Sequence, residues 1–348
     1  MEPWQQQLKT SLTEPLSLAS RLNLDVGDVR AVAEKYPVQL TPYLLELLAD
    51  RTHPFWKQFV PDPAELADDV ASEDPLAEQE KSPVPAVVHR YPGRVLLLAA
   101  NSCAAYCRFC TRKRRVGNRD QSLSFGQVLD GIDYVADHPE VNEVILSGGD
   151  PLTMNDGLLR ELLDRLRRIQ HVEIIRIATR MPAVLPERVT ESFAAMLRTF
   201  QPIYLTTHFN HPAELTPAAV EACRRLADAG IPLANQTVLL QGVNDDIESL
   251  SQLCLQLLKI RVRPYYLHQL DSVRGTGHFR VSLARGVDLI GQLRQQVSGL
   301  AMPHYIVDSP GGHGKVELLP ENVLARGDRQ WVLRAPDGTS VTVQSEGD

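Results

Sequence analysis

The sequence has no long apolar run. A helix that crosses a bilayer needs roughly 20 consecutive apolar residues, and no apolar run in the 348 residues approaches that length. The N-terminus MEPWQQQLKTSL also lacks the apolar core of a signal peptide. We therefore expect a cytoplasmic protein with no membrane partner. Positive charge is not in excess either, because 36 basic residues face 43 acidic ones and the net charge is −7. The charge balance gives no support for a nucleic-acid partner.

Cysteine is scarce, and its five copies are unevenly placed. Three lie within eight residues, and the other two, Cys223 and Cys254, fall on apolar sides of predicted helices. An odd, clustered set in a chain of this size excludes a disulfide framework and leaves Cys223 and Cys254 as small core residues. The sequence also lacks internal repeats and low-complexity tracts. With 43% apolar and 23% charged residues it has the composition of a soluble globular protein.

The first 90 residues differ in pattern from the rest. Residues 1–90 are rich in Leu, Pro and acidic residues and end in the proline-marked connector 82–85, which predicts a helical N-terminal extension serving as a lid or oligomer surface. From 91 to 315, short apolar or β-branched runs alternate with amphipathic windows. The predicted strands are 94–100, 143–149, 174–180, 203–209, 232–240 and 263–270, with one more at 304–310.

Three helical windows stand out between these strands. Their apolar residues are Leu158, Leu159, Leu162, Leu163 and Leu166; Val220, Cys223, Leu226 and Ala227, ending near Gly230; and Ile247, Leu250, Leu253, Cys254 and Leu257. Six strands alternating with helices predict parallel βαβ units, and six units are too few for a closed eightfold barrel. We therefore predict an α/β fold, a partial (β/α)6 barrel. A small C-terminal segment, 316–348, would hold a hairpin turning at Asp337-Gly338.

Polar residues gather where the predicted strands end, and ligands bind parallel sheets at that edge. They are Ser147-Gly148-Gly149-Asp150, Thr179-Arg180, His208, Asn210 and Asp271.

The strongest motif is Cys103-x3-Cys107-x2-Cys110 in the loop after the first strand. Thiolates are the ligands of iron–sulphur clusters, and three of them leave the fourth iron open for a small molecule. Structural zinc is the alternative, but the nearest downstream histidine, His138, has no paired ligand.

The string CAAYCRFC resembles the motif of the radical S-adenosylmethionine (SAM) superfamily. The resemblance implies a [4Fe–4S] cluster on Cys103, Cys107 and Cys110, with Phe109 against the adenine of SAM. It also implies that Ser147, Gly148, Gly149 and Asp150 bind the methionine amino group, although such a strand-ending turn can equally be a plain turn. The chemistry implied is a 5′-deoxyadenosyl radical that abstracts hydrogen from the substrate.

A second glycine-rich segment, DSPGGHGK over 308–315, first suggests a phosphate loop. Ser309 and Val316 break that pattern, because it requires Gly and Ser or Thr at their positions. A lysine on such a loop can serve as a Schiff-base amine, or it can be a solvated side chain on a turn.

Residues 85–320 resemble lysine 2,3-aminomutases, in the strings HRYPGRVLLL, CRFCTRKRR, SGGDPL, THFNHP, ANQTVLLQGVND, KIRVRPYYLHQLD and VDSPGGHGK. The resemblance implies pyridoxal phosphate (PLP) bound to Lys315 and contacted by Arg94 and Gln236, with His208 as a further cofactor contact. It also implies that Arg112 holds the substrate carboxylate and that Asp271 and Asp308 bind the distal ammonium of L-lysine. The reaction implied moves the 2-amino group to C3, giving β-lysine.

Several alternatives stay open. Arg112-Lys113-Arg114-Arg115 could form a nucleic-acid patch, and the chain could act on another amino acid, have a degenerate PLP site, or be a non-catalytic iron–sulphur protein. The family's cysteine-rich, zinc-binding C-terminal segment is absent, and Asp246 replaces a partner cysteine. The length resembles a branch that makes β-lysine for elongation factor P, with the opposite product stereochemistry, whereas Thr111 and the PGGHGK loop resemble the free-lysine enzymes. We expect a homo-oligomer and an electron donor such as flavodoxin or ferredoxin.

Overall fold

The computed structural model describes residues 2–68, 71–327, 330–335 and 338–344. Its main sheet has nine strands in the order in which they occur along the chain. They are β1 (Val87–Tyr91), β2 (Arg94–Ala100), β3 (Glu143–Gly148), β4 (Ile174–Ala178), β5 (Ile203–Thr207), β6 (Leu233–Leu239), β7 (Val262–Gln269), β8 (His304–Asp308) and β9 (Lys315–Glu317). Strands β2 to β8 are parallel, and the edge strands β1 and β9 run antiparallel to their neighbours.

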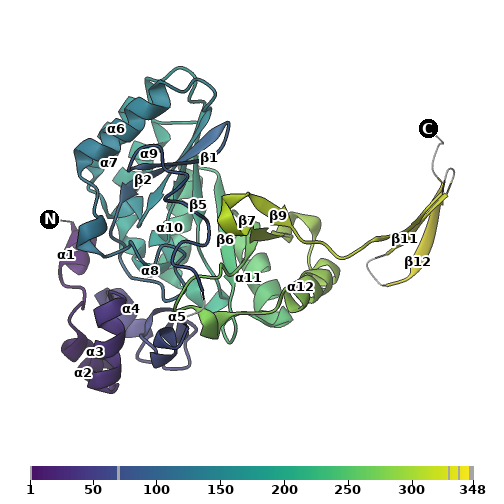
Figure 1. Ribbon diagram of the computed structural model, residues 1–348, viewed down its shortest axis with the longest axis horizontal. Helices are drawn as coiled ribbons and strands as arrows, with labels where there is room; N and C mark the ends of the chain where they lie inside the picture. The colour runs from purple at the N-terminus through teal and green to yellow at the C-terminus, as the bar shows by residue number, and fades with distance from the viewer. Residues whose placement is uncertain (1, 69–70, 328–329, 336–337, 345–348) are drawn as a thin grey trace.

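Helices connect the parallel strands on one side of the curved sheet (Figure 1). They are α6 (Phe125–Ala136), α7 (Asp156–Arg167), α8 (Met181–Val184), α9 (Glu191–Arg198), α10 (Pro217–Asp228), α11 (Ile247–Lys259) and α12 (Leu283–Gln296). Four of the longer helices, α7, α10, α11 and α12, have a side-chain N-cap. The capping residues are Asn155, Thr216, Asp246 and Ser282, and each accepts a hydrogen bond from the backbone N–H three residues later. Asp246, which replaces a cysteine of the family pattern, is thus the N-cap of α11.

The predicted partial barrel is confirmed, since six strand–helix units lead to a seventh parallel strand in a sheet with two free edges. Several predicted strands end one or two residues early, and their polar ends, such as Thr179-Arg180, lie in loops. Leu158 was predicted on the buried side of α7 but is exposed, because the buried stripe begins at Leu159. The boundaries proposed at 90 and 315 stay predictions; β1 and β9 run across them.

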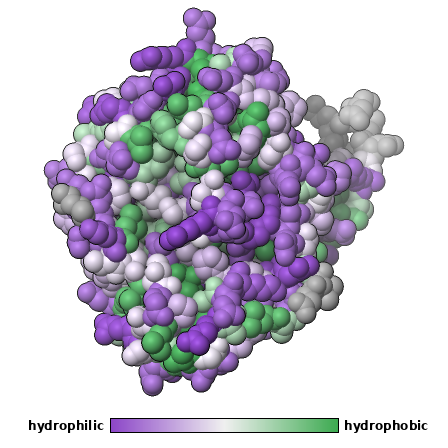
Figure 2. Space-filling view, turned by 60° about the vertical axis from the view of Figure 1, so that its left-hand side comes forward, coloured by the Kyte–Doolittle hydropathy of each residue, from purple (hydrophilic) through white to green (hydrophobic). Residues whose placement is uncertain are grey.

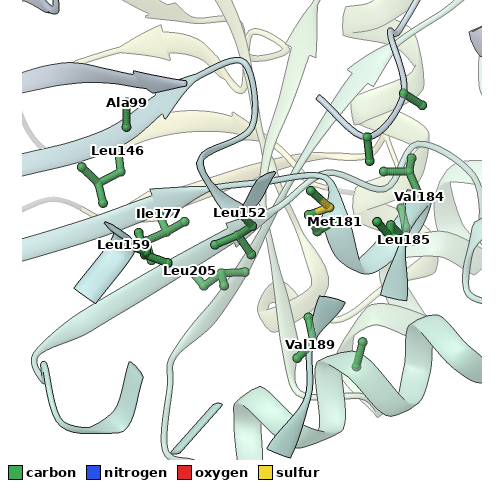
Figure 3. Packing of buried hydrophobic residues seen from close by; sticks show 14 of the residues in the cluster. Ala99, Leu146, Leu152, Leu159, Ile177, Met181, Val184, Leu185, Val189 and Leu205 are labelled. Atoms are coloured by element: carbon green, nitrogen blue, oxygen red, sulfur yellow. The ribbon is translucent and has the colours of Figure 1, made fainter. Parts of the chain in front are cut away.

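The core lies between the sheet and its helices. Side chains from successive strands, including Ala99, Leu146, Ile177 and Leu205, belong to the same apolar cluster as Leu159 of α7, which lies next to Ile177 (Figure 3). Because side chains alternate across a strand, the intervening residues face the other side of the sheet. Those residues line the pocket described below.

The N-terminal extension packs onto the barrel and shares its core. Its described residues form α1 (Pro3–Lys9), α2 (Pro15–Leu22), α3 (Val26–Lys35), α4 (Pro42–Leu47), α5 (Phe55–Phe59) and a short 3₁₀ helix over Pro63–Leu66. Trp4, Leu18 and Phe55 are buried in the same apolar cluster as the sheet. The buried Thr41 hydroxyl donates to the Val184 carbonyl at 3.1 Å, and the Tyr43 hydroxyl lies 2.6 Å from that of Thr216.

The C-terminal residues form a separate three-stranded sheet that stands away from the main body (Figure 1). Its strands are β10 (Val323–Arg326), β11 (Gln330–Arg334) and β12 (Ser340–Gln344). Strands β11 and β12 pair antiparallel, as the predicted hairpin requires. Of its predicted turn, Asp337 lies outside the described residues and Gly338 has a φ of +86°.

The molecular surface in Figure 2 is largely hydrophilic, and its apolar side chains occur in small separate groups. None of the helices in the described part of the chain combines the length and apolar character that crossing a membrane requires.

Candidate active site

A pocket of about 380 Å³ opens at the carboxyl ends of the parallel strands. Alternate residues of the strands line it, such as Arg94 and Leu96 on β2 and Gln236 and Val238 on β6. Every site residue predicted from the sequence contributes to its wall. These are Arg94, Cys103, Cys107, Phe109, Cys110, Arg112, Ser147, Gly148, Gly149, Asp150, His208, Gln236, Asp271, Asp308 and Lys315.

The three cysteines lie on the loop that follows β2, all with free thiols. Burial and the neighbouring carboxylate of Asp150 raise the pKa of Cys103 well above its usual value, and burial raises that of Cys110 to about 11. Cys107 accepts a hydrogen bond from Arg180 Nη1 at 2.8 Å. As they stand, no three His, Cys, Asp or Glu side chains in the described ranges could hold a single metal ion. The donors nevertheless fit a cluster, because three soft ligands share one cavity wall.

A buried ion network fixes this loop to the N-terminal extension. Glu65, fully buried, accepts from Arg108 Nε at 2.9 Å and from Lys113 Nζ at 2.5 Å. Lys113 also donates to the Gly275 carbonyl at 3.0 Å, and burial lowers its pKa to about 8. Since Arg114 pairs with Asp74 at 2.9 Å, the basic run turns toward acidic groups of the protein itself. This pairing argues against the nucleic-acid patch that the sequence left open.

The turn after β3 is shaped by neighbouring backbone. Gly148 has a φ of +120°, and a Cβ there would lie 2.2 Å from the Ala100 carbonyl oxygen. A Cβ on Gly149 would lie 2.3 Å from the carbonyl oxygen of Ser102. Both positions therefore require glycine because the backbone that enters the cysteine loop approaches them closely.

Asp150 orders the loop after β4 rather than pointing free into the pocket. Its carboxylate accepts from the Thr179 hydroxyl at 2.7 Å and from the Arg180 backbone N–H at 2.7 Å. Burial raises its pKa, although these hydrogen bonds act in the opposite direction. The predicted contact of Asp150 with SAM stays a prediction.

The sequence placed Arg180 among the polar residues at the strand ends without giving it a role, and in the structure it lines the pocket next to the cysteine loop. Besides Cys107, it contacts Gln58 Oε1 at 2.5 Å and Glu214 Oε2 at 3.3 Å. The guanidinium of Arg180 lies over the ring of Phe109. The ring centroids of Phe109 and His208 are 5.7 Å apart. Burial and the Arg180 charge hold the pKa of His208 well below its usual value, so His208 is neutral.

The predicted Schiff-base lysine begins the edge strand β9. Gly311, Gly312 and Gly314 all have positive φ and turn the chain so that Lys315 enters the pocket. Its backbone N–H donates to the Tyr91 hydroxyl at 3.0 Å, and Nζ contacts the Asp308 carboxylate. Arg94 stacks on Tyr91, its guanidinium 4.0 Å from the ring centroid. A lysine and an arginine on neighbouring walls fit a cofactor that carries an aldehyde and a phosphate.

Two carboxylates near this lysine have opposite electrostatic surroundings. Burial alone would raise the pKa of Asp308, but His268 and Lys315 hold it well below its usual range. Arg90 adds an ion pair at 2.8 Å. Asp271 forms no ion pair among the described residues. The charge of Lys315 lowers its pKa, but burial and the charge of Asp308 outweigh that effect and raise it to about 6.

Arg112, the predicted carboxylate contact, is held by a residue that sequence reasoning missed. Glu78 accepts from Arg112 Nε at 2.9 Å and from Nη2 at 2.7 Å. Arg112 Nη1 has only longer contacts, with Ser147 Oγ at 3.4 Å and the Gly148 carbonyl at 3.5 Å. No local motif predicts that Glu78 is a site residue. The acidic composition of the segment before the connector at 82–85 is the sequence feature that could have drawn attention to it.

Comparisons with known proteins agree with this geometry. The family model described as "Radical SAM superfamily" matches residues 98–254, and the model described as "Lysine-2,3-aminomutase" matches residues 290–348. The chain is 43% identical to the L-lysine 2,3-aminomutase of Fusobacterium nucleatum subsp. nucleatum, over 97% of this chain and 81% of that protein.

Two further relatives differ in their substrates. The L-lysine 2,3-aminomutase of Clostridium subterminale is 42% identical over 99% of this chain and 84% of that protein. The glutamate 2,3-aminomutase of Clostridioides difficile is 37% identical over 98% of this chain and 82% of that protein. At this identity over nearly the whole chain, and with the cysteine loop and the lysine loop on one pocket, the chain belongs to the lysine 2,3-aminomutase family of radical SAM enzymes.

Proposed function

We propose that this enzyme moves the 2-amino group of L-lysine to C3, giving β-lysine. The observation that carries the proposal is the distribution of charge in the pocket. Arg112 lies beside the end of β3, whereas Asp308 ends β8 and Asp271 follows β7. A cation beside the end of β3 and two carboxylates at the ends of the neighbouring strands β7 and β8 match an amino acid with a carboxylate at one end and an ammonium at the other.

Each charged group has a defined task in this proposal. Arg112 binds the α-carboxylate through two parallel hydrogen bonds. Asp308 and Asp271 accept hydrogen bonds from the distal ammonium. Lys315 Nζ, held in the free enzyme by Asp308, binds PLP and exchanges it for the α-amino group of the substrate. The enclosing walls keep water from the reacting carbon.

The family's cofactors are a [4Fe–4S] cluster, SAM and PLP. When bound, the cluster and SAM supply a hydrogen-abstracting radical, and PLP holds the migrating amino group. Cys103, Cys107 and Cys110 would hold the cluster. Phe109, Gly148, Gly149 and His208 would enclose SAM, and Arg94 and Gln236 would contact PLP; these sets come from the family motif and from their shared pocket.

The glutamate enzyme among the relatives defines the main competing substrate. A glutamate side chain would bring a third carboxylate next to Asp271 and Asp308, and like charges at close range repel. A lysine ammonium instead neutralises them and favours the ionised form of Asp271. The two acids therefore support lysine over glutamate.

The partners follow from the chemistry. Reductive cleavage of SAM consumes one electron, so we infer a small one-electron donor such as flavodoxin or ferredoxin. We also propose a cytoplasmic homo-oligomer, in which the separate β10–β12 sheet would be one available contact surface.

The test is reconstitution without oxygen, using iron, sulphide, PLP, SAM and a reductant. L-lysine and L-glutamate are then supplied separately, and chiral chromatography identifies the β-amino acid formed. Formation of β-lysine alone is the expected result, and its handedness separates free-lysine metabolism from elongation factor P modification. Cleavage of SAM with no β-lysine would overturn the lysine assignment while leaving the family intact.

A further inference from the structure

The guanidinium of Arg112 offers two edges to a carboxylate, and the protein uses one of them. Glu78 grips the Nε–Nη2 edge with both oxygens, at 2.9 and 2.7 Å. This is the two-bond geometry in which a carboxylate and an arginine fit best. Within the described residues, the other edge, Nη1 with the second hydrogen of Nη2, has only the contacts of 3.4 and 3.5 Å with Ser147 and Gly148. That edge remains available to a ligand.

Glu78 is built into a fixed segment of backbone. We define the strap as residues 72–82, the part of the N-terminal extension that contributes Leu76 and Glu78 to the pocket wall. Asp74 accepts from the backbone N–H groups of Glu78 and Gln79 at 3.1 and 3.0 Å. The Ser82 hydroxyl donates to the Glu78 carbonyl at 2.7 Å. Glu78 itself is 6% exposed, so both its backbone and its side chain are held in place.

The strap also contacts both loops that make the site. Arg114, two residues after Arg112, pairs with Asp74 at 2.9 Å. From the other side, the Gly311 N–H donates to the Pro75 carbonyl at 2.8 Å. Glu78 thus has a defined position relative to the cysteine loop and to the lysine loop.

We propose that Glu78 is a positioning residue for the substrate carboxylate: it fixes the Nε–Nη2 edge of Arg112 so that the opposite edge faces the pocket. The inference rests on the proposed function, in which Arg112 meets that carboxylate. Without Glu78, the Arg112 side chain would be free to rotate toward Ser147 and Gly148. Its unpaired guanidinium edge would then no longer face the substrate carboxylate. Preorganisation of this kind raises affinity because fewer rotamers are lost on binding.

The opposite role would be competition, with Glu78 occupying Arg112 until the substrate displaces it. The two roles predict opposite effects of removing the charge. If Glu78 positions Arg112, Glu78→Gln weakens recognition of the carboxylate; if Glu78 competes, the same change strengthens it. The fixed strap favours positioning, since displacement would require a carboxylate free to move.

The experiment compares L-lysine with L-lysinamide, which keeps both amino groups but lacks the carboxylate. Binding to the PLP-loaded enzyme is followed by the absorption change of PLP when the amine replaces Lys315, so no radical turnover is needed. The measured quantity is the ratio of the two dissociation constants. Glu78→Gln is compared with wild type and with Glu80→Gln, a matched change at an exposed acid of the strap.

In the expected result, Glu78→Gln lowers the preference for L-lysine about tenfold, the size of one charge-assisted hydrogen bond, while Glu80→Gln leaves it unchanged. An equal or greater preference in Glu78→Gln overturns the inference. If wild type itself shows no preference for L-lysine over the amide, the proposed role of Arg112 fails, and the inference with it. Should Glu78→Gln fail to fold, Glu78→Asp keeps the charge but is one methylene shorter, so that its carboxylate no longer reaches Nε and Nη2 together; it carries the same expectation.

Discussion

At the scale of single residues, the pocket sets two nearby aspartates to different protonation states. Asp308 is surrounded by Lys315, Arg90 and His268, so it stays ionised across the physiological range. Asp271 has no ion-pair partner in the described part of the chain, and burial with the charge of Asp308 outweighs the effect of Lys315 and raises its pKa to about 6. Substrate binding should therefore depend on pH through Asp271 and not through Asp308.

We expect the dissociation constant for L-lysine to rise as the pH falls through 6, by about tenfold at pH 5, because protonated Asp271 no longer attracts the ammonium. Titration by PLP absorbance measures it. In Asp271→Asn the acidic limb should be flat and the affinity at neutral pH lower. A wild-type profile that is flat between pH 7 and 5 would contradict this role.

The same shift affects stability with the opposite sign. The folded pKa of Asp271 lies above the unfolded value of 3.8, so the folded protein binds the proton more tightly. The destabilisation from the buried charge is fully present above about pH 6 and is lost as the pH falls from 6 toward 4. Asp271→Asn should therefore raise the melting midpoint at pH 7.

At the scale of elements, the packing of α12 on β8 depends on one glycine. A Cβ on Gly286 would lie 1.9 Å from the hydroxyl oxygen of Tyr305. That hydroxyl donates to Gln269 Oε1 at 2.7 Å, and thereby links β8 to β7. The helix can approach the sheet this closely only without a side chain at Gly286.

Gly286→Ala should destabilise the protein by roughly 1–3 kcal/mol, since Tyr305 must move and its hydrogen bond to Gln269 is strained or broken. Urea unfolding measures the change. Gly291→Ala is the matched control on the same helix, because its Cβ would meet nothing closer than 3.5 Å. There we expect no loss, and a gain of up to about 1 kcal/mol from helix propensity. Equal effects of the two changes would disprove this account of the packing.

The sequence predicted the barrel well because its strands carry strong local patterns. RVLLLAA is β2 to the residue, and the other predicted strands differ by a few residues where polar ends leave the sheet. The edge strands β1 and β9 were missed, since each is paired on one side only and lacks a continuous apolar run, and β9 has only three residues. Helix α6 was missed as well, because its buried residues include Gly131, which interrupts the apolar stripe.

The site was predictable where a motif carried it. Cys103 with Arg112, Asp271, and Asp308 with Lys315 come from three separate stretches of sequence, and all line one pocket. The partners of these residues were not predictable. Glu78, Arg180 and His268 act through contacts with residues 34, 73 and 40 positions away, and no spacing rule connects such pairs.

At the scale of the whole molecule, the C-terminal sheet is distinct from the rest. All residues of β10 and β12 are exposed, and Figure 1 shows the sheet at the end of an extended connector. Its stability in this arrangement comes from its own strand pairing. The main body should not depend on it.

Ending the chain after Glu321 should therefore shift the melting midpoint of the main body by no more than roughly 2 °C. Differential scanning calorimetry of the full and shortened chains measures this, with circular dichroism as a check of helix content. A fall of many degrees would mean that β10–β12 packs against the body or against a second copy. Light scattering on both proteins would separate those two explanations.

The strap has a consequence for the order in which the protein is made. It is synthesised early, but it contacts the cysteine loop through Arg112 and Arg114 and the lysine loop through Gly311, which leaves the ribosome more than 200 residues later. Chains grow from the N-terminus at about 5–20 residues per second, so for many seconds the cysteines exist without the wall that encloses them. The enclosed pocket can form only once Lys315 has been added. Capture of the iron–sulphur cluster in its final surroundings therefore belongs after translation, when the thiols have already been open to oxygen and to competing metals.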